Sequence, residues 1–157
     1  MMNSTADTDT IPPLDRDRYL PFLFIAISNH LYRSASQFYQ AHFGIGVTEW
    51  RVLSALAAEP NSTANRLCEV AELDKAAASR SLKVLEGSGY VAIAPHNSDA
   101  RKHLVAFTPA GRNLYEEIVA SALKRQNRMV AGLDGDETEI LIALLGRVRA
   151  NLAKLED

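Results

Sequence analysis

The amino-acid sequence predicts a mainly α-helical domain of the α+β class, in which one β-hairpin interrupts a series of helices. Apolar residues recur at three- and four-residue steps along most of the chain, which is typical of helices with one buried face. The pattern becomes strand-like only in two short runs, 90–94 and 103–107. Hydrophobic residues make up 47% and charged residues 23% of the 157 residues, which is ordinary for a globular domain that has its own core.

The first 14 residues are predicted to form a disordered tail, because they are polar and acidic and contain Pro12 and Pro13. They lack the basic region and apolar run of a signal peptide. Elsewhere no apolar segment approaches the ~20 residues that cross a bilayer. We therefore expect a soluble, cytoplasmic protein with no membrane partner.

Two helices are predicted in the following segment. The first covers 15–42 and ends at Gly44 and Gly46. Thr48 is expected to cap the second, which runs to about Glu59 before Pro60. The apolar positions that define the face of the first helix are Leu20, Phe24, Ile27, Leu31 and Phe38.

Two shorter helices follow, joined by a tight turn. Ser62 or Thr63 is expected to cap a helix over 64–72, and Asp74 to cap a helix over 75–87. The second of these has an apolar face and a face of small and basic residues, namely Lys75, Ala76, Ala77, Ser79, Arg80 and Lys83. This arrangement is the helix-turn-helix pattern.

The hairpin comes directly after this pattern, as a wing does. The sequence predicts two strands, 90–94 and 103–107, and an eight-residue loop between them, 95–102. Polar and charged residues in the loop are His96, Asp99, Arg101 and Lys102.

Two more helices complete the chain. Thr108 is expected to cap the first, with Pro109 at its first position, and this helix runs to about Ala131. Asp134 or Asp136 caps the last helix, which carries a stripe of leucines. The stripe packs either on a second subunit or back on its own core, and the first reading predicts a homodimer.

The charge distribution points to a polyanionic partner at one place. The formal net charge is −2, yet residues 75–103 contain five basic and two acidic side chains.

The only cysteine, Cys68, excludes an internal disulfide and is interpreted either as a buried apolar residue or as a redox-sensing thiol. The four histidines have no metal-ligand spacing, and no catalytic or phosphate-binding motif is present, so neither an enzyme nor a metal or other cofactor is expected.

An ordered set of motifs resembles the MarR family of bacterial transcription regulators. It begins with Thr48-Glu49-Trp50-Arg51-Val52-Leu53 and continues with Leu73-Asp74-Lys75, Ser79-Arg80, Leu82, Leu85-Glu86, Gly89-Tyr90-Val91, Asp99-Ala100-Arg101 and Phe107-Thr108-Pro109-Ala110-Gly111. The resemblance covers about 15–156. It implies a domain over 15–157 with a winged helix-turn-helix core at 48–108, a two-stranded wing, and dimerisation helices at 15–43 and 109–157.

The resemblance implies binding to palindromic double-stranded DNA, with 75–87 in the major groove and the wing in the minor groove. Arg80 and Lys83 suit base edges or phosphates, and Arg101, held by Asp99, suits a narrow minor groove. The expected DNA-binding residues are Thr63, Lys75, Ala76, Ala77, Ser79, Arg80, Lys83, His96, Asp99, Arg101 and Lys102. Ala76 and Ala77 stand where similar proteins often have Ser and Thr.

The resemblance also implies a repressor released by a small ligand such as an aromatic acid. Candidate ligand-binding residues are Phe22, Ser28, Asn29, His30, Arg33, Trp50 and Arg51. Two alternatives stay open at the level of sequence: a winged-helix protein-interaction module that binds no DNA, and a redox-responsive regulator that uses Cys68.

Overall fold

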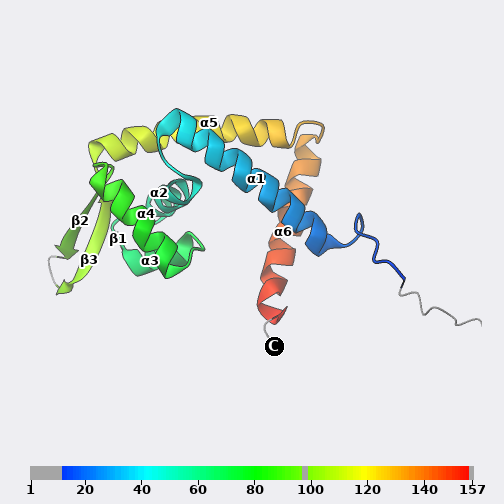
Figure 1. The fold of residues 1–157 in the computed structure, drawn as a ribbon, viewed down its shortest axis with the longest axis horizontal. Coiled ribbons are helices and arrows are strands. Elements are labelled where there is room, and N and C mark those ends of the chain that lie inside the picture. The colour runs from blue at the N-terminus through cyan, green and yellow to red at the C-terminus, as the bar shows by residue number, and fades with distance from the viewer. Residues whose placement is uncertain (1–11, 97–98, 156–157) are drawn as a thin grey trace, which may run out of the picture.

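The computed structural model describes residues 12–96 and 99–155, and over these residues the chain forms six α-helices and one small antiparallel sheet. Figure 1 shows α2, α3, α4 and the sheet gathered in one lobe, with α1 and α5 running out from it and α6 descending from the end of α5. In chain order the elements are α1 (Leu20–Phe43), α2 (Val47–Ala58), β1 (Ser62–Thr63), α3 (Ala64–Val70), α4 (Lys75–Gly87), β2 (Val91–His96), β3 (Asp99–Phe107), α5 (Pro109–Met129), α6 (Gly135–Leu152) and a 3-10 turn η1 (Ala153–Leu155).

Most helix ends lie where local chemistry predicted them. The Thr63, Asp74 and Thr108 side chains each accept a hydrogen bond from a backbone N–H in the first turn of the following helix. Of the two candidates for α6, Asp134 is the cap, since its carboxylate accepts from the backbone N–H of Glu137 at 2.8 Å. These caps fix the starts of α3, α4, α5 and α6.

Two predicted helix starts are wrong. The first helix begins at Leu20 rather than at residue 15, because residues 16–18 form a turn and Pro21 fits only within a first helical turn. Thr48 does not cap α2, because Gly46 takes the cap position and Thr48 lies inside the first turn. Gly44 ends α1 in the left-handed conformation (φ 67°), as the sequence predicted.

The predicted two-stranded wing is part of a three-stranded sheet with the order β1-β3-β2. β1 pairs with β3 through Ser62 opposite Val105, and a two-residue strand is too short to show any periodicity. The eight-residue loop is also wrong, because β2 extends to His96 and β3 begins at Asp99. The pairing shifts register between Pro95 and His96, where proline offers no N–H to the ladder.

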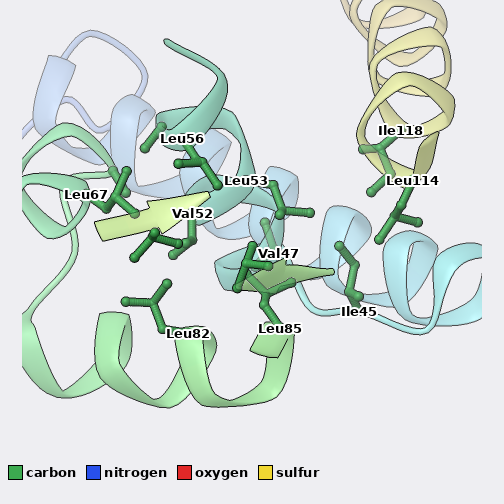
Figure 2. Packing of buried hydrophobic residues seen from close by; sticks show 14 of the residues in the cluster. Ile45, Val47, Val52, Leu53, Leu56, Leu67, Leu82, Leu85, Leu114 and Ile118 are labelled. Atoms are coloured by element: carbon green, nitrogen blue, oxygen red, sulfur yellow. The ribbon is translucent and has the colours of Figure 1, made fainter. Parts of the chain in front are cut away.

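The core is centred on α2. Figure 2 shows leucines of α4 pointing at Val47 and Val52 of α2, with Leu114 and Ile118 of α5 near Ile45. The fully buried side chains are Val52, Leu53, Leu56, Leu67, Ser81, Leu85, Val105 and Ile118. The lobe therefore holds its helix-turn-helix on a single apolar cluster.

α5 starts in direct contact with the turn before β2. A Cβ atom built on Gly111 would lie 1.8 Å from the carbonyl oxygen of Tyr90. The same carbonyl accepts the backbone N–H of Thr108 at 3.1 Å. Glycine at 111 is therefore required by space rather than by backbone conformation.

α6 differs from the other long helices, because it contributes no buried residue within the chain. Its leucine stripe and the first half of α1 remain exposed, with Ile25 at 56% and Ile142 at 53%. Over the residues that the structure describes, no helix combines the length and the apolar character needed to cross a membrane.

Candidate nucleic-acid interface

The two faces of α4 are chemically distinct. Its inner face buries Ala78, Ser81, Leu82 and Leu85 in the lobe. Its outer face exposes Lys75, Ala76, Ser79, Arg80 and Lys83, and we call this set the exposed face of α4. Ala77 is half-buried at the edge between the two faces. A helix anchored on one side and basic on the other is free to enter a DNA groove.

The positive charges on this face are not neutralised by other described residues. Lys75, Arg80 and Lys83 form no ion pair within 12–96 and 99–155. Arg66 on α3, in contrast, binds the carboxylates of Glu59 at 2.5 Å and of Glu69 at 3.0 Å. Hydrogen bonding from Arg66 holds the pKa of Glu59 below its ordinary value. Within α3 and α4, the cations that form no ion pair with a described residue therefore lie on α4.

A groove separates the start of α3 from α4 and ends at strand β2. It has a volume of about 390 Å³ and is lined by Ala64, Asn65, Cys68, Lys75, Ala78, Ser79, Leu82, Lys83, Glu86 and Ile93. The groove brings Lys75, Ser79 and Lys83 of the predicted set together with Asn65. Sequence reasoning missed Asn65 because it considered only the apolar positions of this short helix.

Thr63 is the cap of α3 and directly precedes Ala64, which lines the groove. Its hydroxyl accepts the backbone N–H of Arg66 at 3.3 Å. The hydroxyl therefore has a structural role, and its own proton remains able to reach a phosphate.

The wing is formed by β2 and β3 and extends from the lobe beside α4 (Figure 1). The backbones of His96, Asp99, Arg101 and Lys102 belong to these strands. Their side chains lie outside what the structure describes, so the expected contact between Asp99 and Arg101 stays a prediction.

The seven predicted ligand-binding residues do not meet in one cavity. Phe22, Ser28, Asn29 and Arg33 are exposed along α1. His30 lines a cavity between α1 and α5, whereas Trp50 and Arg51 lie on α2 along a different groove.

Trp50 and Arg51 make intramolecular contacts that account for their side chains. The ring of Trp50 stacks on that of Tyr115 with 5.6 Å between centroids. The Arg51 guanidinium donates to the carbonyl oxygens of Ala71 at 2.5 Å and Glu72 at 2.8 Å. Arg51 thus satisfies carbonyls at the C-terminal end of α3, in the turn before α4.

The cavity between α1 and α5 has a volume of about 450 Å³ and is lined by His30, Leu31, Ser34, Ala35, Tyr39, Arg125, Gln126, Arg128 and Met129. Arg125 donates to the Ser34 hydroxyl at 2.8 Å and lies 4.6 Å from the centroid of the Phe38 ring. Burial raises the pKa of Tyr39, and the positive charge of Arg125 partly opposes that shift. Sequence reasoning missed Arg125, because nothing in the pattern of α5 distinguishes it from the other basic residues.

Cys68 is 8% exposed, and its Sγ donates to the carbonyl oxygen of Leu73 at 2.8 Å. The thiol is therefore a buried donor within the helix-turn-helix. Nucleophilic and redox chemistry needs an accessible sulfur atom, and the Cys68 side chain is almost entirely buried.

Comparison with known proteins decides the family. The model of the MarR family matches residues 43–102, which include the helix-turn-helix and most of the wing. The structure of a MarR/EmrR family transcriptional regulator from Acinetobacter sp. ADP1 is 30% identical, covers 90% of this chain and 99% of its own, and superposes with a TM-score of 0.82. The chain belongs to the MarR family.

Two relatives from Bacillus subtilis (strain 168) agree with this MarR-family assignment. The HTH-type transcriptional regulator YwaE is 27% identical over 82% of this chain and 79% of its own length. The HTH-type transcriptional regulator YdgJ is 29% identical over 75% of this chain and 72% of its own. The chain is thus a MarR-family, DNA-binding transcriptional regulator with the winged-helix fold.

Proposed function

We propose that this MarR-family regulator binds palindromic double-stranded DNA with α4 in the major groove. The observation that carries the proposal is the exposed face of α4, where cations that form no ion pair with any described residue lie beside small side chains. Ala76 and Ala77 allow close approach of the helix and suit contact with thymine methyl groups. Sequence discrimination then depends mainly on Arg80.

The proposed contacts fall into two classes. Arg80 reads base edges, since a guanidinium bonds both O6 and N7 of guanine, and Lys75, Ser79, Lys83 and Thr63 contact phosphates or bases along the groove. In the wing, His96, Asp99, Arg101 and Lys102 face the minor groove, where Arg101 responds to a narrow, electronegative site. The proposed domain division keeps 48–108 as this DNA-binding core.

We infer that the active species is a homodimer formed by the helices in 15–43 and 109–157. An isolated helix in water is marginally stable, so α6, with 18 residues and none of them buried, requires a partner. The exposed apolar residues of α6 include Ile140, Leu141, Ile142, Leu144 and Leu145, and those of α1 include Leu20, Ile25 and Ile27. A second copy presents the same surface, and two-fold symmetry matches a palindromic site.

We further propose that a small organic acid releases this repressor from DNA. The α1–α5 cavity supports this reading, since its Arg125, Arg128 and His30 provide positive or donating groups for a carboxylate and its Leu31, Ala35 and Met129 provide apolar contact. The cavity adjoins α1, which joins the proposed dimer region to α2. We place this regulator in the cytoplasm with its DNA and assign it no enzymatic role.

The proposed DNA binding is tested by selecting duplexes from a random pool with the full-length protein. We expect recovery of a palindrome that binds much more tightly than a scrambled duplex of equal composition. Log affinity should fall linearly with log salt concentration, as counterion release requires. Recovery of no sequence preference would favour the protein-interaction alternative.

The effector proposal is tested with small aromatic carboxylates and matched neutral amides, by following displacement of labelled operator DNA. Arg125→Gln should keep the operator affinity and weaken the response to the carboxylates, with Arg16→Gln near the start of the chain as the control. An unchanged response in Arg125→Gln would remove this cavity as the effector site.

A further inference from the structure

One carboxylate joins the corner between α1 and α2 to the recognition helix α4. Oε2 of Glu49 accepts the backbone N–H of Gly46 at 2.9 Å. Oε1 of the same side chain accepts the hydroxyl of Ser81 at 2.7 Å, across 32 residues of sequence. Hydrogen bonds to an ionised acceptor are roughly twice as strong as bonds between neutral groups.

Ser81 is a polar exception on the inner face of α4. Its side chain is 2% exposed, and its inner-face neighbours are Ala78, Leu82 and Leu85. A buried hydroxyl without a partner is costly, so the bond to Glu49 is what makes serine acceptable here. Apolar packing has no preferred direction, whereas this bond fixes the rotation of α4 about its own axis.

Gly46 provides the space that this carboxylate occupies. A Cβ atom at 46 would lie 2.5 Å from Oε2 of Glu49. The backbone at 46 is extended (φ −84°, ψ 169°), a conformation that any residue can adopt. The glycine therefore serves the approach of the carboxylate rather than an unusual backbone angle.

We propose that Glu49 is a positioning residue that determines DNA sequence specificity without touching DNA. Ser81 directly follows Arg80 and precedes Lys83 by two positions, so a rotation of α4 that breaks the Glu49–Ser81 bond re-aims both cations. Phosphate contacts tolerate such a rotation better than base contacts, which require aligned donors and acceptors. This inference rests on the proposed role of α4 in reading DNA.

The test compares Glu49→Gln, Ser81→Ala and the double variant in the full-length protein. The readout is the ratio of the Kd for a scrambled duplex to the Kd for the selected palindrome, at one salt concentration. We expect each single variant to lower this ratio about 10-fold. A loss of this size is what one mismatched base pair typically costs, because one base contact is misplaced. Kd for the scrambled duplex should change less than about 2-fold, because the phosphate-facing cations remain.

The double variant should lower the ratio by less than the sum of the two single losses, since both variants weaken the Glu49–Ser81 bond and only Glu49→Gln also perturbs the bond from Gly46. Additive losses, or an unchanged ratio in Glu49→Gln and Ser81→Ala, would overturn the proposal.

Ile118→Val is the matched control, because Ile118 is fully buried on α5 and its side chain takes no part in the hydrogen bonds of the Glu49 carboxylate. It should lower Tm while leaving the specificity ratio unchanged. Suppose that Ile118→Val lowers Tm as much as the Glu49→Gln and Ser81→Ala variants do. A lower specificity ratio in Ile118→Val would then show that stability, rather than the position of α4, determines specificity. If the wild-type protein does not prefer a palindrome over the scrambled duplex, the proposed function itself is wrong. If the wild-type protein and the variants prefer the palindrome equally, only the positioning role of Glu49 is wrong.

Discussion

Replacing Gly111 by alanine should strongly destabilise the fold, although the change adds one methyl group. The added Cβ would lie 1.8 Å from the carbonyl oxygen of Tyr90. Heavy atoms do not approach this closely, so α5 must move by roughly 1 Å or more from the turn before β2. The movement strains the bonds by which Thr108 reaches Tyr90, one from its N–H at 3.1 Å and one from its hydroxyl at 3.2 Å.

The expected cost follows from these contacts. Overpacking typically costs about 1–3 kcal/mol, and each weakened hydrogen bond adds about 1 kcal/mol. The higher helix propensity of alanine stabilises α5 by about 1 kcal/mol and partly offsets this cost. The net loss for Gly111→Ala is therefore about 2–4 kcal/mol, which lowers Tm by roughly 4–16 °C in a chain of this size.

Far-UV circular dichroism during heating measures this shift, at one protomer concentration because unfolding of a dimer depends on it. Gly87→Ala is the control, since nothing lies within 4 Å of a Cβ at that position and its backbone is helical. It should leave Tm unchanged or raise it slightly. A Tm for Gly111→Ala within about 2 °C of the wild-type value would refute the reasoning.

Further predictions concern DNA binding, assembly and the turn before α4. Arg80→Ala should cost about 1–3 kcal/mol per half-site of the selected palindrome and relax the preference at one base pair in each half-site, measured by anisotropy titration against single-base variants. Lys83→Ala should instead weaken all duplexes alike and reduce the salt slope by about 1 per subunit, which is about 2 for the proposed dimer. Leu141→Glu combined with Leu144→Glu should convert the proposed dimer to a monomer in light scattering, and an unchanged mass would contradict the proposed interface. Arg51→Met should lower the free energy of unfolding by roughly 1–3 kcal/mol, because it removes a charged donor from two carbonyls at the end of α3.

Local chemistry made the order of helices predictable. Asp74 and Thr108 precede their helices with side chains that accept first-turn N–H groups, and Gly44 adopts the left-handed conformation that ends α1. Each signal involves residues within four positions of one another, so it can be recognised in the sequence without knowledge of the tertiary structure.

Features that depend on distant pairing were not predictable. Ser62 becomes a strand residue only because Val105 lies opposite it, 43 positions later. The extension of the wing strands to His96 and from Asp99 likewise follows from their pairing. The proline and polar residues in that segment read as a loop, because local preference was the only guide.

The candidate site shows the same division. The exposed face of α4 followed from helical periodicity, and the structure leaves Lys75, Arg80 and Lys83 on it. The contacts of Arg51 with the end of α3 and of Glu49 with Ser81 could not be predicted, since these partners lie 20 or more residues away. Periodicity assigns a residue to a face, whereas the partner on the opposing element is fixed only by folding.

A salt series of affinities of the full-length protein, for its selected palindrome and for a scrambled duplex, tests whether α4 reads sequence. We expect preference for the palindrome by a factor on the order of 10³ or more, and a steep linear fall of log affinity with log salt for both duplexes. Equal affinity for the two duplexes, or binding that does not respond to salt, would contradict a sequence-reading role for α4.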